Sequence, residues 1–452
     1  MKKIIFIFMA IFLFEAVSYA QSDEAKEPKE IREGRHVAFT LEELYRIAFE
    51  RAEKIMISEE DLYIAETGKD KAVSVLLPKL SAFGNYTRYT KDKTSSSGSG
   101  IQPESSASWG LRLDQSFSLS GRELTAFKIS KENIQKSRYG LYEVKEAYLL
   151  DVSSSYYDVL RARKALEIAE ANVERLTKHR DAAKIRLKVG EVTKTALLRA
   201  EAELSGAQSE LVQAQNGLKL TKAVLARIVG LEGDYDLVET KDSIQYSKEG
   251  EGEATVESLK QKAMSERSEL KSLELQKKIS EKEVAYARGA YWPTLSVEGV
   301  YSRREDEPDS FSDNRESIYG GLNLNFPFFE GGLRIAEVNE AKAKQRQAEL
   351  AYKDKRKDIG IEVENAYLDL KTQEGVMEKF RDQVAYARDN YNAVSKQFEY
   401  GLANSLDVMD ANTLLVTAER QLSDAKYNYQ LSVLKLQKAT GTLLKTAGIM
   451  SE

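Results

Sequence analysis

Few residues in this 452-residue chain are of types that could carry out chemistry. The chain has no cysteine and two histidines, His36 and His179, so thiol chemistry is excluded and a histidine-rich catalytic or metal cluster is not expected. Asp407 and Asp410 are spaced so that both carboxylates lie on one face of a helix. Like charges held together raise each other's pKa or attract cations. Alternatively, Asp407 only favours the start of a helix electrostatically.

The composition excludes several classes of protein. Charged residues make up 31% of the chain and the mean hydropathy is −0.48, which is too polar for a bundle of membrane helices. Hydrophobic residues make up 42%, which is too many for a disordered chain. The net charge of −5 gives no electrostatic reason to expect nucleic-acid binding. We expect no catalytic residues, no cofactor and no metal site, and His179 is expected on a solvated helix face.

The N-terminus has the pattern of an export signal at 1–20. Two lysines precede an apolar run at 4–14, and a small-residue cleavage site ends at Ala20. The run is too short to cross a bilayer, and Glu15 interrupts it, which disfavours the alternative of an N-terminal anchor. The highly charged residues 21–37 are expected to be a flexible leader. The mature chain is therefore predicted to be exported.

The sequence contains an internal duplication of one unit. Leu77-Pro78-Lys79-Leu80 returns as Trp292-Pro293-Thr294-Leu295 at a shift of 215, and Val189-Gly190 returns as Tyr400-Gly401 at a shift of 211. A nearly constant shift predicts a duplicated half of about 210 residues rather than a solenoid. The predicted parts are a first repeat at 38–230, a linker at 231–253, a second repeat at 254–442 and a C-terminal tail at 443–452.

Long helices are predicted in both repeats. Proline is absent between Pro103 and Pro293 and after Pro327, and these stretches are rich in strong helix formers. Apolar residues there keep a 3–4 spacing, which is typical of antiparallel coiled coils. The predicted helices are 41–76, 122–188 and 193–228, then 256–291, 334–400 and 404–440. The central helix of each repeat holds 67 residues and is therefore ~100 Å long.

Four strands are predicted between the helices, at 80–90, 108–118, 294–302 and 317–328. Trp109, Leu111 and Leu113, for example, alternate with Arg112 and Asp114. Each strand is about 10 residues long, which suits a tilted membrane-spanning strand. Four strands cannot close a barrel, and an open sheet edge cannot face lipid. Two chains would supply eight strands, whose barrel has room only for side chains. Three chains would supply twelve strands, whose barrel leaves room for a pore.

From about 38 to 442, the chain resembles the TolC-like outer-membrane efflux protein (OEP) family. The resemblance rests on the duplicated half and on three motifs. These are Glu266-Arg267-Ser268-Glu269-Leu270, Gly401-x5-Asp407-Val408-Met409-Asp410-Ala411 and Ala425-Lys426-Tyr427-Asn428-Tyr429. It implies a mainly α homotrimer with a long periplasmic α-barrel and a 12-stranded β-barrel in the outer-membrane lipid of a Gram-negative-type bacterium. It also implies passive conduction of substrates from an inner-membrane pump (RND, ABC or MFS type) through a periplasmic adaptor (membrane fusion protein).

Two turns of the same construction join the long helices to the returning ones. Gly190 and Gly401 are expected to end helices in left-handed conformation, and Thr193 and Asn404 to cap the next helices. The resemblance implies that these turns contact the adaptor and that Asp407 and Asp410 form an acidic, cation-selective ring at the periplasmic aperture. The turn residues assigned to the adaptor contact are Val189, Gly190, Glu191, Val192, Tyr400, Gly401, Leu402 and Ala403. The alternative is a helix hairpin that has no partner.

Two other functions compete with the channel. A secreted periplasmic coiled-coil scaffold or spacer would explain the helices, but not four strands with aromatic ends. A surface enzyme would need a nucleophile or a ligand cluster, which the sequence does not offer. The sequence does not indicate which substrate passes through the channel.

Overall fold

The structure is a computed structural model that describes residues 37–94, 100–239, 255–307 and 315–448. The predicted signal peptide, nearly all of the leader, most of the linker and the end of the C-terminal tail lie outside these residues. The described chain divides into two units. The smaller unit pairs strand β1 (Val37–Phe39) in parallel with β6 (Tyr235–Leu237), with Ala38 opposite Asp236. The larger unit contains all the helices and the remaining strands.

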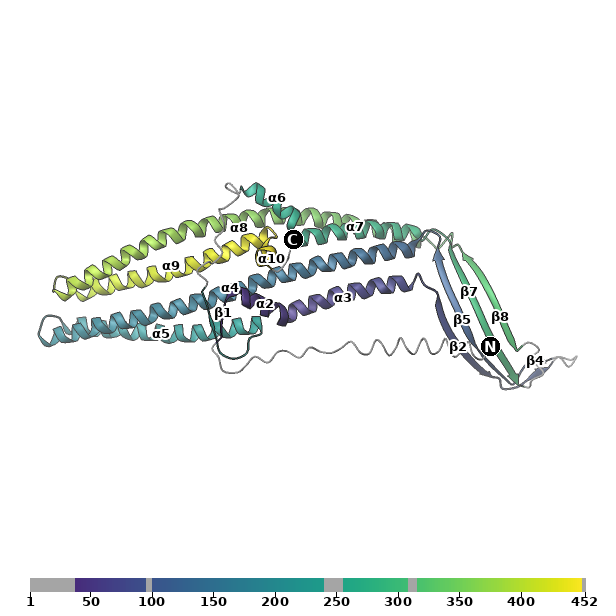
Figure 1. Cartoon of the computed structure of the whole chain (residues 1–452), viewed down its shortest axis with the longest axis horizontal. Helices are drawn as coiled ribbons and strands as arrows, with labels where there is room; N and C mark the ends of the chain where they lie inside the picture. Colours follow the sequence, from purple (N-terminus) through teal and green to yellow (C-terminus); the bar gives the residue numbers. More distant parts are fainter. Residues whose placement is uncertain (1–36, 95–99, 240–254, 308–314, 449–452) are drawn as a thin grey trace. The chain divides into compact units, whose positions relative to one another are not determined.

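The helices repeat in the two halves of the larger unit. The first half has α2 (Leu41–Arg51), α3 (Glu53–Ser74), α4 (Arg122–Lys188) and α5 (Lys194–Val229). The second half has α6 (Val256–Glu266), α7 (Ser268–Gly289), α8 (Leu333–Glu399) and α9 (Ser405–Ala439), followed by α10 (Leu443–Thr446). In each half, two shorter helices pack along one long helix, as Figure 1 shows for α3 and α5 beside α4. The two long helices have 67 residues each, as predicted.

Each predicted first helix is broken into two. The predicted helix 41–76 ends at Arg51 and restarts at Glu53, because Ala52 is extended, with ψ 114°. The predicted helix 256–291 breaks in the same way at Arg267, with ψ 117°. The Arg267 guanidinium compensates for this break: it forms two 3.0 Å hydrogen bonds to the Glu362 carboxylate and also donates to the Ala439 carbonyl. Tertiary contacts therefore favour the break over a continuous helix.

Four strands form one antiparallel sheet in the order β2-β5-β7-β8. They are β2 (Lys79–Arg88), β5 (Ser105–Ser118), β7 (Thr294–Glu307) and β8 (Glu316–Asn325). The four predicted strands are confirmed, but β5 and β7 have 14 residues each and extend beyond the predicted ranges 108–118 and 294–302 into the segments that join the paired strands. Between β2 and β5, the short strand β3 (Lys93–Thr94) pairs with β4 (Gly100–Gln102).

Small and branched apolar residues pack the coiled coils. Val384 and Ala387 of α8 are buried against Leu415 and Ala418 of α9, as the 3–4 spacing predicted. The predicted tail also contributes to the core, because Leu443 and Leu444 at its start are 1% and 2% exposed. In the residues that the structure describes, no helix is both long and apolar enough to cross a membrane.

Candidate functional site

The turns that follow α4 and α8 have the same backbone geometry. Gly190 and Gly401 have φ of +80° and +75°, a region that glycine enters without steric cost. After α4, the Gly190 amide donates to the Leu187 carbonyl and the Glu191 amide donates to the Arg186 carbonyl. The Gly401 turn repeats both hydrogen bonds. Each turn is thus a Schellman motif, which satisfies the last carbonyls of the helix.

The helices that return from these turns are capped by side chains. Thr193 Oγ1 accepts from the Ala196 amide at 3.3 Å. Asn404 Oδ1 accepts from the amides of Leu406 and Asp407, and Asp407 Oδ2 accepts from the Asn404 amide at 3.0 Å. This reciprocal pair is a capping box, which typically contributes ~1 kcal/mol to helix stability. Asp407 therefore has the local structural role that the sequence offered as an alternative.

The two candidate aperture acids are both solvent-accessible. Asp407 and Asp410 are exposed near the start of α9, while their neighbours Val408 and Met409 are buried. The two carboxylates are therefore free to face a common aqueous space. No group of three or more potential metal-ligating side chains occurs in the described part of the chain.

The turns present apolar side chains to solvent. Tyr400, Leu402 and Val189 are 80%, 79% and 66% exposed. Val192, another of the turn residues assigned to the adaptor contact, is partly buried. Because exposed apolar side chains gain nothing from water, their clustering at two adjacent turns is typical of a docking surface.

Two side chains join the turns to each other. Arg186 Nη2 of α4 donates to the Glu399 carbonyl of α8 at 2.6 Å, and its guanidinium lies 4.5 Å from the centre of the Phe398 ring.

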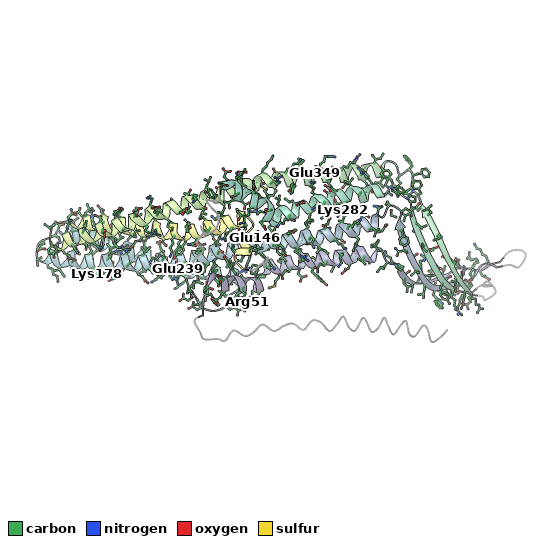
Figure 2. The ribbon with its side chains drawn as sticks, turned by 45° about the horizontal axis from the view of Figure 1, so that its top comes forward. Arg51, Glu146, Lys178, Glu239, Lys282 and Glu349 are labelled. Carbon is green, nitrogen blue, oxygen red and sulfur yellow. The ribbon has the colours of Figure 1, made fainter. Side chains whose placement is uncertain are left out.

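His179 Nε2 lies 2.8 Å from Ser405 Oγ of α9. His179 is 7% exposed, so the prediction of a solvated face was wrong. The preceding residue, Lys178, does point to solvent and pairs with Glu174 at 2.7 Å (Figure 2).

Further polar contacts join the two hairpins away from the turns. Asn412 of α9 donates to Asn172 Oδ1 at 2.7 Å and accepts from Arg175 Nε at 2.9 Å, both on α4. Glu419 accepts from Arg388 at 2.8 Å and lies 3.8 Å from Arg175. The sequence did not predict this network. The only feature of the sequence that pointed to the network was the presence of asparagines inside predicted helices, where asparagine is disfavoured unless it is hydrogen-bonded.

The four-stranded sheet has one apolar face and one polar face. Residues directly opposite in the register share a face. The apolar face includes Leu80, Ala82, Trp109, Leu111, Leu113, Leu295, Val297, Tyr301, Ile318, Leu322 and Leu324. The polar face includes Lys79, Ser81, Arg112, Asp114, Ser116, Ser296, Glu298 and Asn323. Phe83, Val300 and Tyr319 are the larger apolar or aromatic side chains on this face. The Phe83 ring lies over Gly110, where a Cβ would meet it at 2.8 Å.

The comparisons with known proteins agree with this arrangement. The chain matches the family described as outer membrane efflux protein over residues 45–231 and 259–442, one segment in each half. It is 26% identical over 306 residues to the outer membrane protein TolC of Vibrio cholerae, which covers 66% of this chain and 68% of that protein.

Solved structures share the fold. CusC superimposes with a TM-score of 0.79 at 18% identity, over 93% of this chain and 99% of that one. VceC of Vibrio cholerae superimposes with a TM-score of 0.76 at 16% identity, over 89% and 96%. The predicted mainly α fold and the predicted outer-membrane localisation are confirmed. Because the family match spans both halves of the duplicated chain, the protein belongs to the outer membrane efflux protein family.

Proposed function

We propose that three copies of this chain form the outer-membrane channel of a tripartite efflux system. The observation that carries the proposal is the sheet β2-β5-β7-β8, with its apolar face. In the described residues, its outer strands β2 and β8 each pair on one side only. Backbone groups on such edges have no partner in lipid. Three copies would join these edges into a closed cylinder of twelve strands, with the polar faces lining the passage.

Cysteine cross-linking tests this assembly directly, because the chain has no cysteine of its own. One cysteine replaces Asn85 on β2, and a second replaces Ser317, Tyr319 or Gly321 on β8 in separate variants. Oxidation is expected to give covalent dimers and trimers and nothing larger, strongest at one β8 position. Cross-linked products that stop at the dimer, or that extend beyond the trimer, would contradict the proposal.

At the other end of the long helices, the two turns are proposed to receive a periplasmic adaptor of the membrane fusion protein type. The exposed side chains of Val189, Tyr400 and Leu402 support this proposal. The adaptor would deliver substrates from an inner-membrane pump. Replacing Gly401 and Leu402 with bulky charged residues is expected to abolish export while the trimer still assembles. Unchanged export would count against docking at this surface.

Asp407 and Asp410 are proposed to form a ring of six carboxylates at the periplasmic aperture. The support is their exposure on the first turns of α9. Replacing both with asparagine is expected to lower cation selectivity in planar bilayers, because the fixed negative charge is lost. Asp389→Asn, on an exposed part of α8, is the matched control. Reversal potentials that do not change in the double variant would argue against the ring.

The alternative of a periplasmic coiled-coil spacer leaves the apolar sheet face without a role. A detergent-requiring trimer in outer-membrane fractions would support the channel. A monomer that stays in the periplasmic extract would support the spacer.

A further inference from the structure

A pocket of about 200 Å³ lies within the larger unit, where helices of the two repeats meet. Tyr45 of α2, Tyr156 and Tyr157 of α4 and Tyr427 of α9 line it. Leu434 of α9, which is 1% exposed, adds apolar surface. The pocket thus has aromatic and aliphatic walls, which are typical of sites for small molecules.

The pocket is separate from the sites described above. Tyr157 precedes the end of α4 at Lys188 by 31 residues, and the rise of a helix places the turn ~45 Å away. The sheet adjoins the opposite end of α4, which begins at Arg122. Neither docking at the turns nor passage through the sheet therefore accounts for the pocket.

Gln430 of α9 supplies one polar atom without a partner. Its side chain lines the pocket and is 9% exposed, and its Oε1 accepts no hydrogen bond from the chain. A buried acceptor left unsatisfied costs about 1–3 kcal/mol. Such groups are uncommon in folded proteins and call for an explanation. A ligand that donates a hydrogen bond to this oxygen would remove the cost.

The charged residues at the pocket's rim favour a neutral ligand. Glu239, labelled in Figure 2, forms an ion pair with Lys426, so their charges compensate each other. Glu42 is exposed at the rim, where water screens its charge. Among the described residues that line the pocket, no cation remains unpaired to hold an anionic ligand.

The volume of the pocket limits the size of the ligand. An engineered apolar cavity of about 150 Å³ binds benzene, so this pocket has room for one aromatic ring or two fused rings. Tyrosine rings pack against another ring edge-to-face or in offset stacks. We infer that the pocket binds a neutral aromatic molecule of one or two fused rings that donates an N–H or O–H group to Gln430 Oε1.

Indole and indene test this inference as a matched pair, because they have nearly the same shape and only indole has an N–H donor. Binding is measured on the full-length protein in detergent by saturation-transfer NMR and by calorimetry. Indole is expected to bind about fivefold more tightly than indene, since one hydrogen bond contributes about 1 kcal/mol. Gln430→Leu should remove this preference while leaving indene binding unchanged.

A second variant distinguishes binding in the pocket from partition into detergent. Ala447 lines the pocket just after α10, so Ala447→Phe is expected to fill the space and abolish saturable binding of both compounds. Circular dichroism verifies that each variant is folded. Equal affinity of the wild-type protein for the two compounds, or binding that survives Ala447→Phe, would overturn the inference. So would the absence of saturable binding, which would mean that only water occupies the pocket.

Discussion

His179 Nε2 of α4 lies 2.8 Å from Ser405 Oγ of α9, so a buried imidazole joins the two repeats next to their turns. Burial lowers the pKa of His179 below its usual 6.5, and the charge of Arg186 lowers it further. Folding therefore favours the neutral ring. The unfolded chain binds a proton more readily, so stability should decrease as the pH falls below about 6.5.

Urea unfolding between pH 7.5 and 5 measures this dependence, and His179→Gln should flatten it. His36→Gln is the control for the loss of one histidine. If the His179 variant keeps the slope of the wild-type protein, the decrease must come from other groups.

Glu146 is expected to give the opposite pH dependence. Its side chain, labelled in Figure 2, is 5% exposed. Burial raises the pKa of Glu146 to about 7, although the charges of Arg267 and Lys438 oppose the shift. The folded state thus keeps a proton that the unfolded chain loses near pH 4.5. This contribution to stability is present below pH 4.5 and is lost as the pH rises toward 7. Glu146→Gln should therefore stabilise the protein at pH 8, by an amount of order 3 kcal/mol, with little effect at pH 4.5.

Thermal unfolding at pH 5 and pH 8 measures the effect of Glu146→Gln. Glu143→Gln is a useful comparison, because burial also raises the pKa of Glu143 but its side chain is less enclosed. An equal effect of Glu146→Gln at both pH values would show that ionisation of this group is not the cause.

Arg267 is predicted to be among the most sensitive positions in the helical region. Its side chain is 7% exposed and binds two carboxylates, those of Glu269 and Glu362. Arg267→Met would remove the bidentate partner of Glu362, while Glu269 would keep its ion pair with Lys355, at a cost of about 3 kcal/mol for the lost charged hydrogen bonds. Arg267→Lys should recover only part of that loss, because a lysine cannot form the bidentate contact with Glu362. Denaturant midpoints rank the variants, and Arg199→Met, at an exposed position of α5, should have little effect.

Gly401→Ala and Gly375→Ala should change stability in opposite directions. Neither added Cβ would meet another atom within 4 Å, so the difference comes from the backbone alone. Gly401 has φ +75°, where alanine costs about 1–2 kcal/mol. Gly375 lies within α8, where alanine gains about 0.5–1 kcal/mol. Melting temperatures of the two variants test this difference, and two shifts of the same sign would contradict it.

Local signals in the sequence specify the repeated helices, the four strands and the construction of the turns. These features depend on local signals: helix formers without proline, the alternation of Leu111 and Leu113 with polar residues, and glycines followed by capping residues at Thr193 and Asn404. Each signal acts over a few residues, so the sequence alone reveals it. The family resemblance rested on the same local motifs.

The positions of the helix breaks and the side chains that join the repeats depend instead on packing between distant segments. Neither Ala52 nor Arg267 is a helix breaker, yet both leave the helical region, with ψ of 114° and 117°, because contacts made by neighbouring or distant segments outweigh helix propensity. His179 and Ser405 are 226 residues apart, and nothing local to either residue indicates the other. Burial of His179 and the unpartnered oxygen of Gln430 likewise arise from packing between helices, and the sequence of one helix does not specify its neighbour.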